Sequence, residues 1–368
     1  MLIARSPFRV SFGGGGTDLP AYFEAYGGAV LSAAIDKYFY TIVGKRADGH
    51  IQIISSDLRV SQTWNDIRQM SVKESGGPLE IPLAVLKDLD CEVAVDLFLA
   101  SEVPPGTGLG SSASVCVNVL QAMATFLQRP LSKYDLAEKA FSIATDVLGK
   151  PVGKQDEFAA AFGGLNFMTF ERDGSSRVEP IRLKTEVLSA LQQKLMLFFT
   201  GSARDSWSIL KDQEESSRKR QGAAVEALHE IRELAYRMRL ALEQDHLEQF
   251  GLLLHEGWEN KKKISSRISN PAIDRMYTVA RNMGAAGGKI TGAGGGGFML
   301  LYCDEERQPA VRQAFAAESI HEMRFGFDFG GSKVLVNDPF VDREETCAPP
   351  WTFVTAAKQQ LAGRKAPG

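Results

Sequence analysis

The feature that most constrains this chain is a glycine-rich segment at residues 104–113, with the sequence PPGTGLGSSA. The residues before it, 93–99, alternate between apolar and polar and predict a strand. After it, apolar residues recur at spacings of three and four over 115–127, which predicts an amphipathic helix. A glycine turn between a strand and a helix lets backbone N–H groups approach an anion, and the helix N-terminus adds partial positive charge. The segment therefore predicts an anion-binding loop.

The same loop predicts a nucleotide site. The residues that would hold the phosphates are Pro105, Gly106, Thr107, Gly108, Leu109, Gly110, Ser111 and Ser112. The two serines fall at the predicted helix start, where a hydroxyl can cap the helix, contact phosphate or bind Mg²⁺. The loop is not a Walker A motif, because no Lys-Ser or Lys-Thr pair follows the glycines. We expect ATP and Mg²⁺ as cofactors, with Ser112 as a metal ligand; the alternative is a capped turn that binds nothing.

The chain contains two further glycine-rich segments, one near each end of the sequence. At 292–297, five of six residues are glycine, directly before a predicted strand at 298–303. A flexible linker would not lie between a helix and a buried strand, so this segment predicts a close approach of the backbone to a neighbour. The other glycine segment, 13–16, which comes first in the chain, follows the β-prone run 2–12, which contains Arg9, and is closed by Asp18. Taken alone, either charge could be a solvated turn residue.

The remaining pattern predicts two domains. Further strands are expected at 29–43, 50–55 and 195–200, and helices at 133–148, near 155–162, at 225–242 and from Pro271 to the pair at 287–288. A polar turn lies at 172–183. We place an N-terminal domain at 1–180, a C-terminal domain at 190–340 and a tail at 341–368, because 368 residues are more than one ordinary core accommodates.

Composition excludes several classes of partner. Forty-two Lys and Arg nearly balance 45 Asp and Glu, for a formal charge of −3. Proteins that bind nucleic acid or membrane surfaces show a basic excess, so we expect neither partner. No run reaches the roughly 20 apolar residues of a membrane span, and no secretory signal is visible. The four cysteines are scattered, so we expect a reducing cytoplasm and no cysteine metal site.

The three glycine segments, in this order, resemble the motifs of the GHMP kinase superfamily, which includes galactokinase, homoserine kinase and mevalonate kinase. The matched segments are 6–18, 104–113 and 289–298, and the similarity in spacing extends over roughly residues 3–335. The resemblance implies an α+β two-domain GHMP kinase fold. Its N-terminal domain would be like ribosomal protein S5 domain 2 and its C-terminal domain ferredoxin-like, with ATP against the second motif.

Within the superfamily, several strings resemble the D-glycero-D-manno-heptose 7-phosphate kinases. They are FGGGGTD at 12–18, GKQD at 153–156, AAAFGGLN at 159–166 and HEGW at 255–258, the last followed by three lysines at 261–263. Galactokinases have Glu-His where this chain has Gly15-Gly16. The resemblance implies phosphorylation of a sugar phosphate, most simply a heptose 7-phosphate at its anomeric hydroxyl. A homodimer is an open expectation.

The resemblance also implies residue roles. Asp156 would orient and deprotonate the attacking hydroxyl, although an aspartate there could instead be a helix N-cap. Arg9 would hold that carboxylate and face developing charge. Asp18 would bind sugar hydroxyls, and the other expected substrate contacts are Thr17, Gly15, Gly16, Lys154 and Gly294. A solvated lysine is the alternative for Lys154.

One position departs from the family. The related kinases hold a carboxylate ligand of Mg²⁺ on the helix before the catalytic loop, and this chain has Ala144 there. Asp146, two residues on, lies about 200° around an ideal helix and should face elsewhere. Candidates for binding a substrate phosphate, by composition alone, are Arg204, Lys261, Lys262 and Arg267. Two alternatives stay open: a kinase of this fold for fucose, N-acetylhexosamine, mevalonate or homoserine, and a non-catalytic ligand-binding relative.

Overall fold

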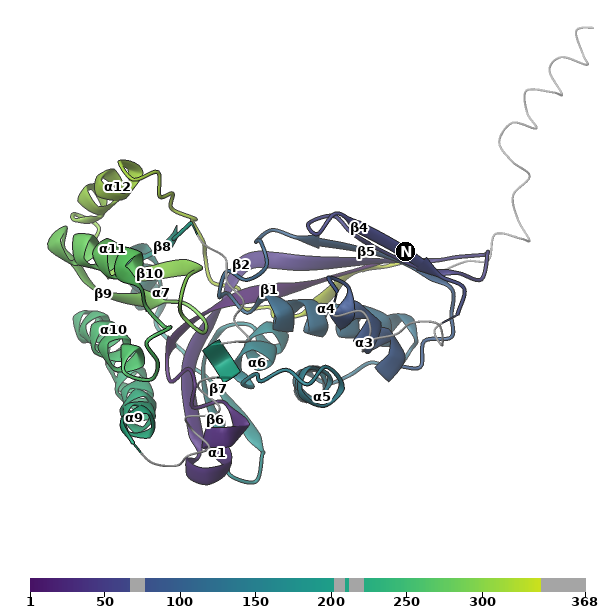
Figure 1. Ribbon diagram of the computed structural model, residues 1–368, viewed down its shortest axis with the longest axis horizontal. Coiled ribbons are helices and arrows are strands. Elements are labelled where there is room, and N and C mark those ends of the chain that lie inside the picture. Colours follow the sequence, from purple (N-terminus) through teal and green to yellow (C-terminus); the bar gives the residue numbers. More distant parts are fainter. Residues whose placement is uncertain (67–76, 202–208, 212–221, 339–368) are drawn as a thin grey trace, which may run out of the picture.

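The large sheet of the protein is built around two long strands. The computed structural model describes residues 1–66, 77–201, 209–211 and 222–338. In these, β1 (Leu2–Gly13) and β2 (Gly28–Lys45) pair antiparallel over nearly their whole length. The sheet runs in the order β11-β1-β2-β5-β3-β4, and β6 and β7 extend it from the other half of β2 (Figure 1). The remaining strands are β3 (Ile51–Ser55), β4 (Val60–Trp64), β5 (Val95–Ser101), β6 (Leu165–Phe170), β7 (Ser176–Pro180) and β11 (Lys333–Asn337).

The length of β2 allows it to bind two different neighbours on one edge. Its second half, 39–45, pairs with β5, and its first half, 28–33, pairs with β6. The strand leading into the 104–113 loop and the strand following α6 are therefore held on the same scaffold. Strand β3 pairs parallel with β5, and every other pairing in this sheet is antiparallel.

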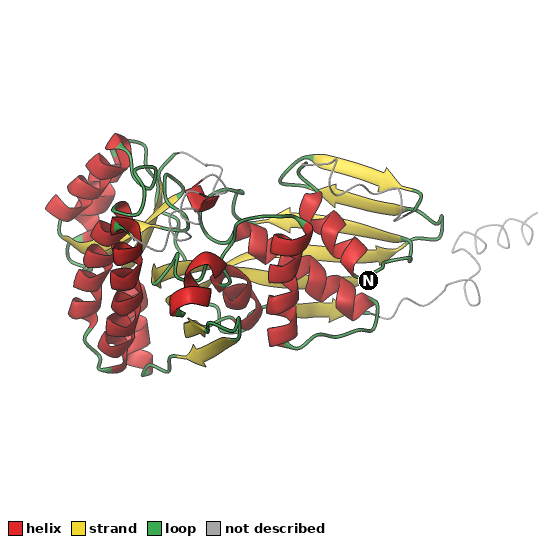
Figure 2. Ribbon diagram, turned by 60° about the horizontal axis from the view of Figure 1, so that its bottom comes forward, coloured by secondary structure: helices red, strands yellow, loops and turns green. Residues whose placement is uncertain are grey.

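Helices α3 (Glu80–Asp88), α4 (Ser111–Phe126), α5 (Lys133–Ser142) and α6 (Gln155–Phe162) form a layer on one face of this sheet (Figure 2). Helix α4 packs on β1 and β2 through an almost wholly apolar face. The Ser114 hydroxyl, in its first turn, donates to the carbonyl of Pro7 on β1 at 2.9 Å. That bond fixes the start of α4 against the strand that contains Arg9.

A second, three-stranded sheet has the order β8-β10-β9. It is made of β8 (Leu195–Phe199), β9 (Ala285–Ile290) and β10 (Phe298–Cys303), and all six residues of β10 are buried. Helices α10 (Leu247–Lys262) and α11 (Pro271–Asn282) pack on β9. Helix α9 (Ala223–Glu243) packs on α10 and against β1 and β2, and α12 (Gln308–Ala316) packs on α11 (Figure 1). Helix α1 (Pro20–Tyr26) follows β1, and α7 (Thr185–Lys194) precedes β8. None of the described helices is long and apolar enough to cross a membrane.

Most of the expected elements are confirmed, with three corrections of detail. Helix 133–148 ends as an α-helix at Ser142 and continues as a five-residue π-helical segment, η2 (Ile143–Val147). Helix α11 begins at Pro271, capped by Asn270, but ends at Asn282, because Gly287 and Gly288 belong to β9.

The third correction concerns the domain limits. Residues 333–337, expected in the C-terminal domain, form β11 and pair with β1 at the edge of the large sheet. The last strand in the described part of the chain therefore lies in the large sheet, beside a strand of the N-terminal half. The expected tail at 341–368 lies outside the described residues.

Candidate active site

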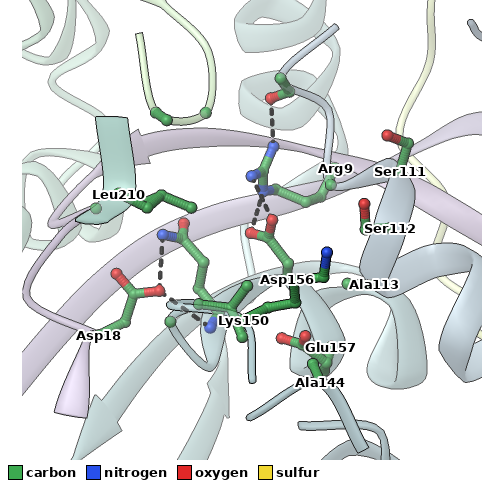
Figure 3. A pocket seen from close by; sticks show the side chains of 18 of the residues that line it. Arg9, Asp18, Ser111, Ser112, Ala113, Ala144, Lys150, Asp156, Glu157 and Leu210 are labelled. Atoms are coloured by element: carbon green, nitrogen blue, oxygen red, sulfur yellow. Dashed lines mark hydrogen bonds and ion pairs between the residues drawn. The ribbon is translucent and has the colours of Figure 1, made fainter. Parts of the chain in front are cut away.

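The three glycine segments meet at one cavity of about 280 Å³. The second segment contributes Pro105, Gly106, Gly108, Gly110, Ser111 and Ser112 to its lining, the first Gly15, Gly16 and Asp18, and the third Gly292 and Ala293. Figure 3 shows Arg9, Asp18, Asp156 and the two serines around this space. Segments almost 300 residues apart in sequence thus form a single site.

Glycine is required where the second and third segments touch. Gly108 has a φ of +79°, and a Cβ there would lie 2.5 Å from the carbonyl oxygen of Thr291. A Cβ on Gly292 would lie 2.7 Å from the α-carbon of Gly108. The backbone N–H of Phe298 also donates to the carbonyl of Thr107 at 3.1 Å. The third segment therefore buttresses the anion loop, which explains the close backbone approach expected from its composition.

Arg9 and Asp156 form a bidentate ion pair at the centre of the cavity. Arg9 Nε donates to Asp156 Oδ1 and Arg9 Nη2 to Asp156 Oδ2, both at 2.7 Å (Figure 3). Arg9 Nη1 donates to the carbonyl of Gly108, also at 2.7 Å. The Arg9 side chain is 4% exposed and that of Asp156 26% exposed, so the carboxylate still faces the cavity. This geometry positions Asp156 rigidly relative to the anion loop.

Asp156 is not a helix cap. Helix α6 begins at Gln155, its N-cap residue is Lys154, and no side chain caps it. Asp156 is the second residue of the helix, and its side chain points to Arg9. The N-cap alternative is therefore wrong, and the carboxylate is available to the cavity.

Asp18 lies fully buried on the cavity wall. Its Oδ1 accepts from the backbone N–H of Gly16 at 2.8 Å, and its Oδ2 accepts from the backbone and side-chain amides of Gln155 at 3.2 and 3.0 Å. Burial, and then the negative charge of Asp156, raise the pKa of Asp18, while these hydrogen bonds oppose the increase. Asp18 is thus a fixed polar group a short way from Asp156.

Two buried lysines approach the same region. Lys261, at the end of α10, lines the cavity and donates to the carbonyl of Gly292. Burial, and then the charge of Arg9, lower the pKa of Lys261 to about 8. Lys289 on β9 donates to the carbonyl of Phe12 at 3.3 Å, and burial and the Lys261 charge lower its pKa well below the usual value. This end of the cavity is suited to an anionic group.

The start of α4 leaves its donors facing the cavity. Gly110, with a φ of +77°, precedes the helix, and no side chain caps it. Ser111 and Ser112 therefore do not serve as caps, and both line the cavity. The first N–H groups of a helix have no intrahelical acceptor, so this end can bind phosphate.

Several expected site residues lie behind the cavity wall. The Thr17 hydroxyl lies 2.7 Å from the carbonyl of Gly14 and 3.0 Å from that of Ala29, and Thr107 donates to Pro104. Leu109 is fully buried, and Gly294 packs on Ile268. These residues shape the loops rather than line the cavity, because their polar groups are used within the turns or because they are packed in the core.

Lys154 is a clear correction. Its ammonium group donates to both oxygens of Glu138 at 2.9 and 2.8 Å and to the carbonyl of Gly174 at 2.7 Å. The side chain is 5% exposed and is absent from the cavity lining among the described residues. Lys154 is therefore neither a substrate contact nor a solvated lysine; it joins α5 to the turn between β6 and β7.

The four candidates for binding a substrate phosphate also differ in whether they line the cavity. Lys261 lines the cavity, whereas Lys262 pairs with Glu259 at 2.9 Å and lies over the Trp258 ring. Arg267 is not among the lining residues, and Arg204 lies outside the described residues.

The sequence analysis missed five polar residues of the lining, which are Ser11, Glu80, Lys150, Gln155 and Glu157. Ser11 Oγ and Gln155 Oε1 are buried without a hydrogen-bond partner in the described part of the chain, and so is Glu157 Oε2. Gln155 and Glu157 directly flank Asp156, and Ser11 is two residues from Arg9 on the same strand. The alternation of a strand could have identified Ser11, since residues i and i+2 share a face.

The comparisons with known proteins identify the family. Residues 80–164 match the GHMP kinases N terminal domain, and residues 238–321 match the GHMP kinases C terminal model. Over 336 residues the chain is 34% identical to a D-glycero-alpha-D-manno-heptose 7-phosphate kinase of Campylobacter jejuni, covering 89% of this chain and 97% of that protein. The chain therefore belongs to the GHMP kinases, and the expected fold and ATP-dependent kinase class are confirmed.

Two further relatives indicate the range of similarity. The crystal structure of a D-glycero-D-manno-heptose 1-phosphate kinase from Bacteroides thetaiotaomicron superposes with a TM-score of 0.76 at 28% identity, covering 92% of this chain and 100% of the other. An L-fucokinase/L-fucose-1-P guanylyltransferase from Bacteroides fragilis is 26% identical over 339 residues, which are 84% of this chain and 35% of that protein.

Proposed function

We propose that this kinase transfers the γ-phosphoryl group of ATP to a hydroxyl of a sugar phosphate, with D-glycero-D-manno-heptose 7-phosphate as acceptor and its anomeric hydroxyl as the site of transfer. The product would be the 1,7-bisphosphate. The Campylobacter relative supports this acceptor, because it is named for it and matches nearly full length. The protein would work in the cytoplasm, where ATP is available.

One observation favours a phosphorylated acceptor. The cavity is lined by a buried lysine, Lys261, and no carboxylate of the described residues lies within ion-pairing distance of it. A second buried lysine, Lys289, lies behind it. Two buried cations repel each other and lose hydration, and an anion between them and the cavity offsets both costs. The phosphate of a sugar phosphate supplies that anion.

Two buried polar groups of the cavity lining could hydrogen-bond the hydroxyls of the acceptor. Ser11 Oγ and Gln155 Oε1 are buried, line the cavity and have no partner within the described residues. Both lie near Gly15, since a Cβ on that glycine would meet the Gln155 amide at 3.3 Å and Ser11 Oγ at 3.4 Å. Buried polar groups without partners are costly and are normally satisfied. A polyhydroxylated ligand beside Asp18 would satisfy them.

Asp156 is the residue that would act on the acceptor hydroxyl during phosphoryl transfer. Each carboxylate oxygen has two lone-pair sites, so it can accept from Arg9 and still accept from an acceptor hydroxyl. Asp156 would orient that hydroxyl and take its proton, while Arg9 and the N–H groups of 106–112 face the negative charge of the transferring group. Transfer of a phosphoryl group depends mainly on such positioning and charge stabilisation.

The residues present also fit Mg²⁺. The Ser112 hydroxyl lines the cavity and is not used as a helix cap. The described residues contain no group of three or more His, Cys, Asp or Glu side chains arranged for a metal. Mg²⁺ is commonly held by one or two protein ligands together with phosphates and water, so Ser112 suits a nucleotide-bound ion. When bound, the ion would neutralise charge on the β- and γ-phosphates.

A coupled ADP-release assay across a panel of acceptors tests the proposal. The panel should contain heptose 7-phosphate, the unphosphorylated heptose, L-fucose, N-acetylhexosamine, mevalonate and homoserine. We expect the highest kcat/KM for the heptose phosphate. A preference for L-fucose would instead follow the Bacteroides fragilis relative, and no ADP release with any acceptor would indicate a non-catalytic protein.

A further inference from the structure

Glu157 is a buried acid on the wall of the cavity, and one of its two carboxylate oxygens has no hydrogen-bond partner in the described part of the chain. It is the third residue of α6, is 2% exposed, and lines the same space as Ser112 and Asp156 (Figure 3). Its Oε2 atom has no hydrogen-bond partner within the described residues. A buried carboxyl in this state is costly, and such groups in native structures require an explanation.

The other acids of the cavity all have partners. Asp156 pairs with Arg9, Asp18 accepts three N–H groups, and Glu80 pairs with Lys150 at 3.0 Å. Of the four acidic residues in the lining, Glu157 is the one with a buried carboxylate oxygen that has no hydrogen-bond partner in the described part of the chain. It is therefore the acid with an oxygen left for a ligand.

At position 144, where the resemblance to related kinases implies a carboxylate ligand of Mg²⁺, this chain has the methyl side chain of an alanine. Ala144 belongs to the π-helical segment η2 and lines the cavity together with Glu157. Asp146, on the same segment, accepts from the hydroxyls of Ser142 at 2.8 Å and Thr145 at 3.0 Å and does not line the cavity. Asp146 thus faces elsewhere, as the helical geometry predicts, and cannot compensate for Ala144.

We propose that Glu157 supplies the carboxylate that Ala144 lacks, and that it acts with Ser112 as a protein ligand of the Mg²⁺ bound with the nucleotide. The small side chain at 144 leaves space in the cavity, and the acid enters it from α6 instead of η2. This assignment rests on the proposed function, because it requires a metal–nucleotide complex in the cavity. It gives the unpartnered Oε2 a partner, and it adds to Ser112 a carboxylate, the type of protein ligand that Mg²⁺ bound with a nucleotide usually has.

Mn²⁺ binding provides a test that does not depend on turnover. Mn²⁺ would be titrated into the protein saturated with a non-hydrolysable ATP analogue, and free Mn²⁺ measured by electron paramagnetic resonance. We expect Glu157→Gln, which keeps the shape but removes the charge, to weaken Mn²⁺ binding by at least about tenfold. Binding of the analogue in EDTA, measured by calorimetry, should change little. An Mn²⁺ affinity within twofold of the wild type would overturn the proposal.

Two further variants make the result specific. Asp146→Asn removes an acid of the neighbouring segment that does not face the cavity, and its Mn²⁺ affinity should equal that of the wild type. The double variant Ala144→Glu with Glu157→Gln moves the carboxylate to the family's position and should recover part of the lost affinity. If Glu157→Gln does not fold, Glu157→Asp, which withdraws the charged group by one methylene, should weaken Mn²⁺ binding, and unchanged binding would again overturn the assignment.

Failure of the proposed function would look different. If the acceptor is a molecule other than heptose 7-phosphate, the ADP-release panel will show a different preference. Mn²⁺ binding will still depend on Glu157 in that case. A protein that does not bind the nucleotide at all would fail the calorimetric control in every variant, the wild type included, and would overturn both proposals.

Discussion

Gly153 and Asp18 fit together so closely that a Cβ at position 153 would lie 2.0 Å from Asp18 Oδ2. The loop after Gly153 wraps the same residue, because the backbone N–H of Lys154 donates to the Asp18 carbonyl and that of Gln155 to its carboxylate. The position of the Asp18 carboxylate therefore depends on the missing side chain at 153. This contact joins the segment 6–18 to the loop that precedes α6.

Gly153→Ala should displace the Asp18 carboxylate and impair binding of the acceptor. Gly153 does not have a positive φ, so the substitution acts through the contact with Asp18 rather than through backbone strain. A displacement of about 1 Å in a positioned group can cost about 100-fold, so we expect kcat/KM for the acceptor to fall about 10–100-fold. Steady-state kinetics with the acceptor varied would measure it.

The matched control is Gly44→Ala in β2, where a Cβ would make an ordinary contact of 3.7 Å with the Asp96 side chain. Its kinetics should match the wild type. Nucleotide affinity in Gly153→Ala should stay within a few-fold, and an equal loss for ATP and acceptor would show that the substitution distorts the whole cavity instead of Asp18.

Asp156→Asn should abolish most of the turnover while leaving the fold intact. The change keeps the shape of the side chain but removes its charge and basicity, and it leaves Arg9 without its ion-pair partner. General-base catalysis contributes about 10²–10⁴-fold, so kcat should fall by about that factor, toward the lower end if the transition state is dissociative. ATP affinity should stay within a few-fold.

Asp146→Asn is the control for Asp156→Asn, because it also removes one carboxylate charge near the cavity but not within it. It should turn over like the wild type. Near wild-type kcat in Asp156→Asn would contradict the catalytic role and the mechanism built on it.

Lys154→Ala should lower stability and leave substrate binding unchanged. The ammonium group joins Glu138, Gly174 and Ser176, so its removal leaves the Gly174 carbonyl without this donor and leaves Glu138 with the Ser176 hydroxyl as its remaining donor. The Glu138 side chain is 41% exposed, and water can replace part of the interaction. We expect the free energy of unfolding to fall by about 1–3 kcal/mol in denaturant titrations. A rise in the acceptor KM without loss of stability would restore a role for Lys154 in the site.

Much of the cavity could be predicted from the sequence because its loops are built from glycine. Glycine marks backbone that approaches a neighbour closely, and the order of the three segments is specific. The contacts confirm this expectation at Gly108 and Gly292, where no Cβ could fit. Arg9 and Asp156 were predicted from the resemblance to the GHMP kinases, because taken alone Arg9 could have been a solvated turn residue and Asp156 a helix cap.

The directions of individual side chains could not be predicted from the sequence in the same way. Lys154 and Gln155 are adjacent, yet the first points to Glu138 and the second to Asp18. That difference is set by the start of α6, which a sequence pattern places only to within a residue or two. Likewise, β11 could not be assigned to the large sheet, because its pairing with β1 spans more than 300 residues.

Lys261 should make the reaction sensitive to pH near 8 when the acceptor is phosphorylated. Burial and the charge of Arg9 lower its pKa to about 8, so its ammonium group is charged below that pH and loses its proton above it. If Lys261 binds the acceptor's phosphate, kcat/KM for heptose 7-phosphate should decrease as the pH rises through about 8, by about tenfold or more when the lysine is neutral. The unphosphorylated heptose should show a much smaller decrease with the same enzyme. Lys261→Arg keeps a charge at every pH in this range and should remove the decrease, whereas Lys262→Met, outside the cavity, should retain it. Equal pH profiles for the phosphorylated and unphosphorylated sugars would show that Lys261 does not contact the phosphate.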